Sequence, residues 1–220
     1  VCAVAGVRFL IFSIHPIANL IIDENVIAGE ADDLRSNIDR LYPGKLEPPT
    51  ESANREDKLP AQFGHDPRTI ASEKSGFIQA IAMENLLQLA QEKELIIRLC
   101  RRPGQFIAAG DILAEVVPRA QGGDALADDI LRNIFFGRDR TPTQDIEYSI
   151  DKLVEVAVRA LSTGVNDPFT AITCIEWLGA ALIQMAERKI PSRWRCDENG
   201  KLRVITDATD FEGIAASALN

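Results

Sequence analysis

Five arginines form the most suggestive chemical group of the chain: Arg98, Arg101, Arg102, Arg138 and Arg140. A guanidinium group is a planar fork of N–H donors that binds a phosphate or carboxylate through parallel hydrogen bonds. The group therefore predicts an anion-binding site, which would serve a ligand sensor. Together with acids such as Asp139 or Asp145, it would instead serve an enzyme that acts on a phosphorylated substrate. The alternative is a solvated face on which the arginines pair with neighbouring carboxylates.

A second candidate lies in the segment TGVNDPFTA, residues 163–171. Asn166 and Asp167 carry oxygen atoms that could bind a metal, and the start of a helix attracts anions. The same residues suit a turn between two helices, in which Gly164 ends one helix, Asp167 caps the next and Pro168 takes its first position. The turn gives every residue a structural role, so we favour it and keep Asn166 and Asp167 as a possible functional turn.

Other chemistry has less support. Glu147, Asp151 and Glu155 are spaced four residues apart and could form a metal-binding edge on a helix, but no Glu-x-x-His motif accompanies them. The chain has no GxSxG elbow, P-loop or GxGxxG motif, and only two histidines, His15 and His65. We therefore predict no catalytic residue, no cofactor and no metal, and we leave open whether the protein is an enzyme.

The elements that would position these groups predict an α+β fold. Residues 68–118 should form a small β module. Within it, PGQFIAAGD at 103–111 resembles the barrel-sandwich fold of biotinyl and lipoyl carrier domains and of efflux adaptor proteins. Gly104 and Gly110 would supply the positive φ angles of its turns. Lys74 and Lys93 do not lie in the exposed hairpin that carrier domains modify, so we do not expect a carrier.

Residues 119–220 should form a helical subdomain with a terminal β-hairpin. A helix over 124–136 comes first. The next helix spans 141–161, with Thr141 as its cap and Pro142 at its first position. It should pack antiparallel against a helix over 167–188. The dipeptide Asn199-Gly200 then predicts a hairpin turn, and a last short helix follows at 210–219.

The opening of the chain differs from the rest. Residues 1–22 are apolar, with Arg8 as their only formal charge. Because about 20 apolar residues span a bilayer, we expect the end of a transmembrane helix, and the alternative is a buried helix of a soluble protein. Residues 23–43 predict an amphipathic helix with an acidic outer face. Residues 44–67, rich in proline, predict a linker.

Composition limits the partners and the compartment. The formal net charge of −9 disfavours general nucleic-acid binding, which needs a basic face. Four scattered cysteines, Cys2, Cys100, Cys174 and Cys196, suggest a reducing compartment rather than a disulfide framework. We therefore expect the inner cell membrane, with the soluble part on the cytoplasmic side.

Several stretches together resemble one family. They are IHPIANLI, NVIAGEADDLRSNIDRLYP, SGFIQAI, RLCRRPGQFIAAGDILAEV and GRDRTPTQDIEYSIDKLVEVAVRALSTGVNDPFTAITCIEWLGAAL, in this order. The chain is similar to an uncharacterised group of bacterial predicted membrane proteins, domain of unknown function 2254. The resemblance implies transmembrane helices followed by a soluble C-terminal region, and it brings no known activity.

The function predicted on these grounds is non-enzymatic. We expect the soluble domain of a membrane protein with a role in assembly, regulation or transport. Its helical faces would serve self-association into a homo-oligomer or binding to other proteins of a membrane complex. The rival predictions are a sensor of an anionic or phosphorylated ligand, or an enzyme, both using the arginine group.

Overall fold

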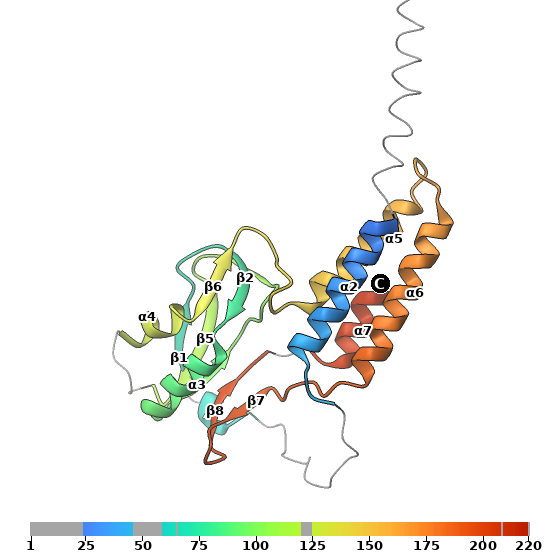
Figure 1. Cartoon of the computed structure of the whole chain (residues 1–220). Coiled ribbons are helices and arrows are strands. Elements are labelled where there is room, and N and C mark those ends of the chain that lie inside the picture. The colour runs from blue at the N-terminus through green and yellow to red at the C-terminus, as the bar shows by residue number, and fades with distance from the viewer. Residues whose placement is uncertain (1–23, 46–58, 65, 120–124, 208, 220) are drawn as a thin grey trace, which may run out of the picture.

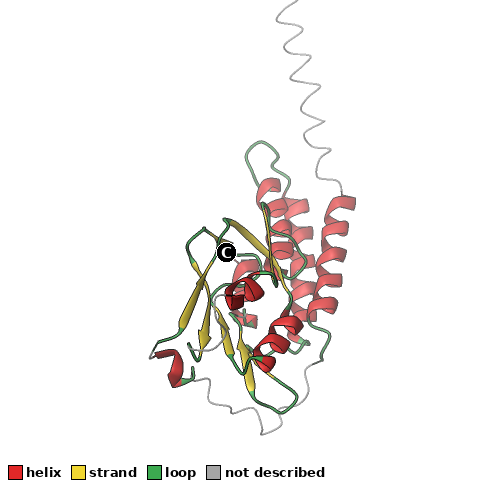
Figure 2. Cartoon of the chain, turned by 90° about the vertical axis from the view of Figure 1, so that its left-hand side faces the viewer, coloured by secondary structure: helices red, strands yellow, loops and turns green. Residues whose placement is uncertain are grey.

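The computed structural model describes residues 24–45, 59–64, 66–119, 125–207 and 209–219. The predicted α+β class is confirmed. Two regions lie side by side, a β region and a bundle of helices, as Figures 1 and 2 show from two directions. The expected membrane helix at 1–22 and most of the expected linker lie outside the described residues.

The bundle consists of four helices whose apolar faces meet. They are α2 (Glu24–Leu41), α5 (Ile146–Ala160), α6 (Pro168–Ala186) and α7 (Phe211–Leu219). Ile27, Ala31, Leu34 and Ile38 of α2 recur at helical spacing and are all buried, as an amphipathic helix requires. Helices α5 and α6 pack as the predicted antiparallel pair, joined by a short turn at the end of the bundle where α2 begins (Figure 1).

The β region contains two sheets. The larger has the strand order β1-β5-β3-β8-β7, and the smaller has the order β4-β2-β6. Their strands are β1 (Arg68–Ala71), β2 (Gly76–Ile81), β3 (Ile96–Leu99), β4 (Phe106–Ile107), β5 (Ile112–Val117), β6 (Ile134–Gly137), β7 (Trp194–Cys196) and β8 (Leu202–Ile205). Helices α3 (Met83–Glu92) and α4 (Ala125–Leu131) bury their apolar residues in the same core. A short 3-10 helix, η2 (Ala61–Gly64), packs Phe63 against Val117 and Ile205.

The barrel-sandwich prediction is not supported. Among the described residues no sheet closes on itself. Strand β3 pairs in parallel with β8 of the C-terminal hairpin, which extends the larger sheet instead. The local turns of the motif are nevertheless as predicted, because Gly104 and Gly110 have φ angles of 90° and 95°. Both sheets include strands from beyond residue 118, and the division of the chain into segments stays a prediction.

The helix predicted over 124–136 is wrong in its second half. Helix α4 ends at Leu131, and residues 134–137 form β6, which pairs with β2. Ile134 is buried and Phe135 is exposed, the alternation of a strand. The pairing with β2 is a long-range contact that outweighs the helical pattern of the local sequence.

The start of α5 also differs from its prediction. Its cap is Asp145, which accepts a hydrogen bond from the Tyr148 amide at 3.1 Å, and not Thr141. Gln144 is engaged elsewhere, because its side chain bonds to the N–H and the C=O of Ile81 at 3.0 and 3.2 Å. The loop before α5 is therefore held against β2. Helix α6, by contrast, begins as predicted, with Asp167 as its cap and Pro168 at its first position.

Candidate functional site

The five predicted arginines do not converge on one point. Arg98, on β3, pairs with Glu115 of β5 at 3.0 Å. Arg101 donates to the carbonyl of Cys100. Arg138 is exposed, and no described residue forms an ion pair with it. Their role in binding an anion stays a prediction, and each paired guanidinium already has an internal acceptor.

Arg102 and Arg140 instead hold the start of α5. Arg102 makes a forked pair with Glu147, with both N–O distances near 3.0 Å. Arg140 bonds to Asp145 at 2.8 Å and to Asp151 at 2.7 Å. The Asp145 side chain is only 4% exposed, so this pair is shielded from water. The two arginines thus link the β region to the bundle.

The acidic row on α5 has no free edge for a metal. Glu147 and Asp151 pair with Arg102 and Arg140, and Glu155 pairs with Arg159 at 2.6 Å. No group of three or more metal-binding side chains occurs in the part of the chain that the structure describes. The geometry therefore favours the structural interpretation of this row.

The turn at Asn166 and Asp167 is tightly organised. Asp167 accepts hydrogen bonds from the amide of Thr170 at 3.2 Å and from its hydroxyl at 2.6 Å. These bonds hold the pKa of Asp167 below its ordinary value. The residue with a positive φ is Asn166, at 51°, and not the expected Gly164. Asn often adopts this conformation, so both residues have a structural role, and a further function for them stays a prediction.

Two of the cysteines have thiols that stay protonated. Burial, followed by the charge of Glu115, raises the pKa of Cys100, and burial raises the pKa of Cys174. Neither forms a disulfide. A thiolate is the reactive form of cysteine, so neither residue resembles a catalytic nucleophile.

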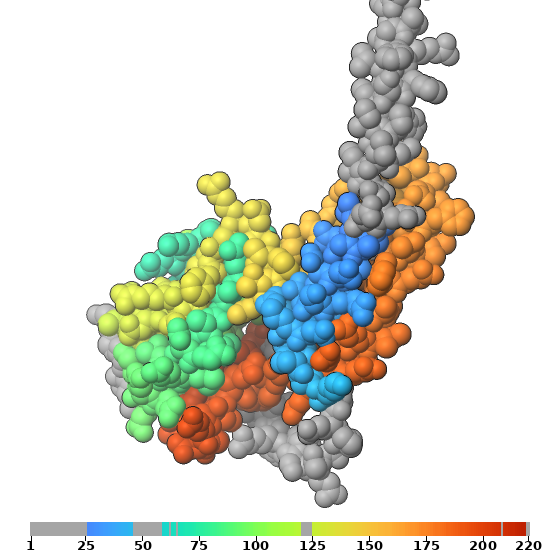
Figure 3. Space-filling view, viewed as in Figure 1, coloured from blue at the N-terminus to red at the C-terminus, as the bar shows by residue number. Residues whose placement is uncertain are grey.

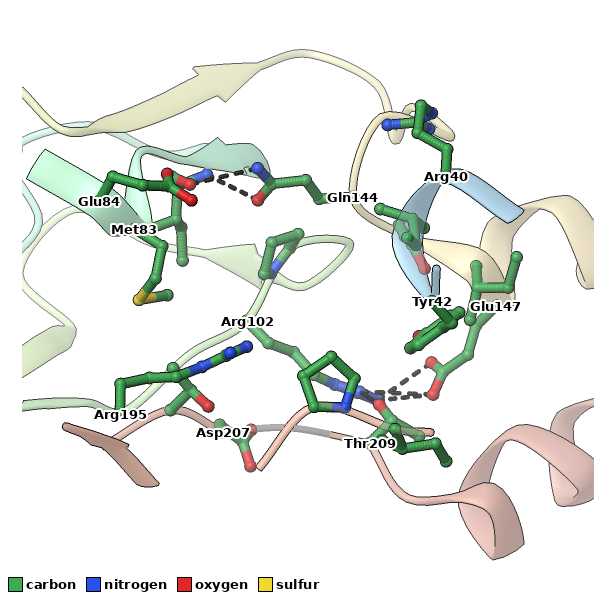
Figure 4. Close-up of a pocket in the computed structure, with 18 residues that line it drawn as sticks. Arg40, Tyr42, Met83, Glu84, Arg102, Gln144, Glu147, Arg195, Asp207 and Thr209 are labelled. Carbon is green, nitrogen blue, oxygen red and sulfur yellow. Dashed lines mark hydrogen bonds and ion pairs between the residues drawn. The ribbon is translucent and has the colours of Figure 1, made fainter. Parts of the chain in front are cut away.

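A cavity of about 340 Å³ lies between the β region and the bundle. Its walls come from the end of α2, the start of α3, the loop after β3, the start of α5, strand β7 and the segments before and after the hairpin. Figure 3 shows the hollow between these parts, and Figure 4 shows the side chains that line it. Of the five predicted arginines, only Arg102 is among them.

The basic residues of this cavity differ in their partners. Arg102 is paired with Glu147, and Arg40 donates to the carbonyls of Thr143 and Pro142 at 2.6 and 3.1 Å. Arg195, on β7, extends into the cavity (Figure 4). Its Nε is buried and no described atom accepts a hydrogen bond from it. Sequence analysis missed Arg195 because no local motif surrounds it.

Tyr42 adds a hydroxyl group to the cavity wall. Burial, and then the charges of Glu147 and Asp145, raise its pKa to about 12, although Arg102 opposes the shift. The hydroxyl is therefore protonated at any physiological pH. It can donate a hydrogen bond to a molecule in the cavity.

The outer face of α6 is the main exposed apolar surface of the bundle. Ile172, Ile175 and Ile183 are 50%, 61% and 67% exposed. Together with Gly179 they form one stripe at helical spacing, separate from the buried face of α6. In Figure 1, α6 lies on the side of the bundle away from the β region. The spacing in the sequence could have revealed this second apolar face.

Helix α6 has the length and apolarity of a membrane-spanning helix, a test that core helices of soluble proteins also pass. Among the described residues it is the one helix that meets this test. Only 28% of its most apolar stretch is buried within the chain, so the core of the bundle does not account for its composition. A further partner would do so.

Comparison with known proteins identifies the family. The model of a family described as predicted membrane protein, DUF2254, matches residues 1–220. Uncharacterized proteins of Mycobacterium bovis and Mycobacterium tuberculosis are each 27% identical over 205 residues, which cover 91% of this chain and 38% of the relative. The chain thus spans about two fifths of the length of these relatives. No solved structure matches. The chain belongs to the DUF2254 family of predicted membrane proteins.

Proposed function

We propose that this chain is an assembly module of a membrane protein, and that two copies associate through the outer faces of their α6 helices. The observation that carries this proposal is the exposed stripe of Ile172, Ile175 and Ile183. Contiguous exposed apolar surface on a folded domain is typical of an interaction site. The arginines, paired with internal carboxylates, leave this stripe as the best-supported functional surface.

Gly179 supports close packing of two helices. It lies in the middle of the stripe, and a Cβ atom added to it would meet nothing within 4 Å. A glycine in a helix interior costs about 1 kcal/mol relative to alanine. No contact within the chain explains this cost. A second helix that packs closely against Gly179 would explain the cost, because small residues allow short distances between helix axes.

The neighbouring helices favour a protein partner over lipid. Helix α2 exposes Asp32, Asp33 and Asp39 beside α6, and α5 exposes Glu155 and Arg159. Immersing the bundle in lipid would desolvate these charges at a cost of several kcal/mol each. A second copy covers the stripe of α6 and leaves the charges of α2 and α5 in water, while the exposed Glu176, which shares this face of α6, must reach solvent at the edge of the contact.

Attachment to a membrane favours this association. Copies held in one membrane share an orientation, so identical faces can meet about a two-fold axis. Confinement also raises their effective concentration. We place the module at the inner membrane, with the described part on the cytoplasmic side, where thiols such as Cys100 and Cys174 stay reduced. Labelling cysteines from outside intact cells tests this side, since labelling there would contradict it.

The test compares two substitutions in the stripe with one outside it. Gly179→Leu adds bulk where the chain itself leaves room, so the fold should keep its stability or gain up to about 1 kcal/mol. Ile175→Glu places a charge in the interface. Ile112→Glu is the matched control, because Ile112 is an exposed isoleucine of the β region.

The measurement is the molar mass of the full chain in detergent, by light scattering, and disulfide cross-linking in membranes through a single cysteine at position 175. We expect a dimer for the unchanged chain and for the Ile112 variant. Both stripe variants should weaken the dimer at least tenfold. A monomeric unchanged chain, or a dimer that tolerates both stripe variants, contradicts the proposal.

A further inference from the structure

Arg195 is the arginine of the cavity whose side chain has no hydrogen-bond or ion-pair partner among the described residues. No described carboxylate lies within ion-pair distance of its guanidinium group, and its Nε–H is buried without an acceptor. Leaving a buried donor unpaired is unfavourable, because the donor loses its hydrogen bond to water and gains none in the protein. A cavity that retains such a group is suited to a molecule that brings an acceptor to it.

Two carboxylates also line the cavity. Glu84, at the start of α3, lies across the cavity from Arg195, and Asp207, which follows β8, lies on the same side as Arg195 (Figure 4). Neither forms an ion pair with a described residue. Both side chains are exposed to solvent. The cavity thus offers one unpaired cationic fork and two unpaired carboxylates.

This arrangement complements a molecule that carries both charges. A carboxylate matches the planar fork of an arginine, and an ammonium group matches carboxylate oxygens. Leu41, Met83, Ile190 and Pro191 line the remaining wall and suit an aliphatic part. The volume of about 340 Å³ is at the small end of the roughly 300–1,000 Å³ of known ligand sites.

We propose that the cavity binds a free α-amino acid, with its carboxylate on Arg195 and its ammonium group facing Asp207. The Tyr42 hydroxyl lies on the opposite side of the cavity, beside Glu147 (Figure 4), and is available to a polar group on the side chain of the amino acid. Because the last residues of α2, Arg40 and Leu41, and the following Tyr42 line the wall, an occupant would contact the helix that begins at the opposite end of the bundle. This site does not depend on the proposed self-association.

The experiment is calorimetric titration of the purified full chain with each of the common α-amino acids. Acetate, inorganic phosphate and methylammonium serve as probes whose charge is of one sign only. We expect saturable binding of at least one amino acid and much weaker binding of all three probes. No saturable binding of any amino acid at millimolar concentration overturns the proposal. Phosphate or acetate binding as tightly as the best amino acid also overturns it.

Three substitutions test the assigned residues. Arg195→Gln should weaken the amino acid at least tenfold, and Asp207→Asn should weaken it while leaving acetate unaffected. Arg138→Gln is the matched control, since it removes an exposed arginine outside the cavity, and it should bind as the unchanged chain does. Unchanged affinity in the Arg195→Gln variant contradicts the assignment.

Thermal unfolding without ligand separates binding from a structural role. Arg195→Gln removes a half-buried guanidinium group whose Nε has no acceptor, so the midpoint should stay the same or rise. If Arg195 paired with Asp207 in solution, both single variants would lower the midpoint and the double variant would lower it no further, which overturns the proposal. Should Arg195→Gln fail to fold, Arg195→Lys keeps the charge without the fork and is expected to weaken binding.

Discussion

At the scale of single residues, Gly104 and Gly110 have the same backbone conformation but different surroundings. Their φ angles are 90° and 95°. A Cβ atom on Gly104 would lie 2.1 Å from Oδ2 of Asp145, the buried cap of α5, whereas Gly110 has nothing within 4 Å. Gly104 therefore both makes a turn of the β region and allows the bundle to approach it.

We expect alanine at these positions to have unequal effects. Gly110→Ala should lower the free energy of unfolding by about 1 kcal/mol through backbone strain alone. Gly104→Ala should lower it by about 3 kcal/mol or more, since it must also displace the Asp145 carboxylate from Arg140. Urea unfolding followed by circular dichroism measures both. Equal losses would show that the close contact is not maintained in solution.

At the scale of elements, the hairpin of β7 and β8 depends on one buried ion pair. Asp197 accepts hydrogen bonds from Nε of Arg203 at 2.8 Å and from the amides of Lys201 and Asn199 at 2.9 and 3.0 Å. These bonds, that from Arg203 first, lower the pKa of Asp197 below its ordinary value. The ionised form is therefore favoured by the folded state.

A carboxyl group with a lowered pKa in the folded state stabilises the fold above its unfolded pKa, which is about 3.9. That contribution is lost as the pH falls through the lower folded value. Asp197→Asn should therefore reduce stability at pH 7, and the difference from the unchanged chain should narrow below about pH 4. Asp66→Asn is the control, because Asp66 pairs with Arg119 at the surface. A pH-independent difference at Asp197 would contradict the assignment.

At the scale of the whole molecule, the β region and the bundle have separate apolar cores. Polar contacts join them, chiefly Arg102 with Glu147, Gln144 with Ile81, and Arg40 with the loop before α5. These polar contacts contribute less to the free energy of unfolding than burial of apolar surface would, since each hydrogen bond adds about 1 kcal/mol net. The two regions should therefore depend on these few contacts to unfold together.

Removing the joint should uncouple the two regions. We expect the double variant Arg102→Ala, Gln144→Ala to broaden the calorimetric unfolding transition or to split it in two, with a loss of about 2–4 kcal/mol of coupling. Arg98→Ala is the control, because its ion pair with Glu115 lies within one sheet. It should leave a single transition. A single sharp transition in the double variant would mean that other contacts hold the joint.

Prediction from the sequence succeeded where the determinants are local. The buried face of α2, the cap at Asp167, the positive φ of two glycines and the hairpin at Gly200 each depend on residues a few positions apart. It failed where a distant segment competes. Residues 134–137 have a helical pattern but pair with β2. Thr141 has the residue type of a helix cap, but Asp145 caps α5 instead, because Gln144 binds Ile81 and holds the preceding loop against β2.

The sequence by itself determined the α+β class, the membership of the membrane-protein family and most helix limits, because apolar periodicity and capping residues act within a few turns of chain. Only the tertiary structure decided the pairing of β3 with β8, the dispersal of the arginines and the cavity around Arg195. The walls of that cavity come from segments between residues 40 and 209. No local sequence pattern predicts this cavity, since it forms where two separately packed cores lie against each other.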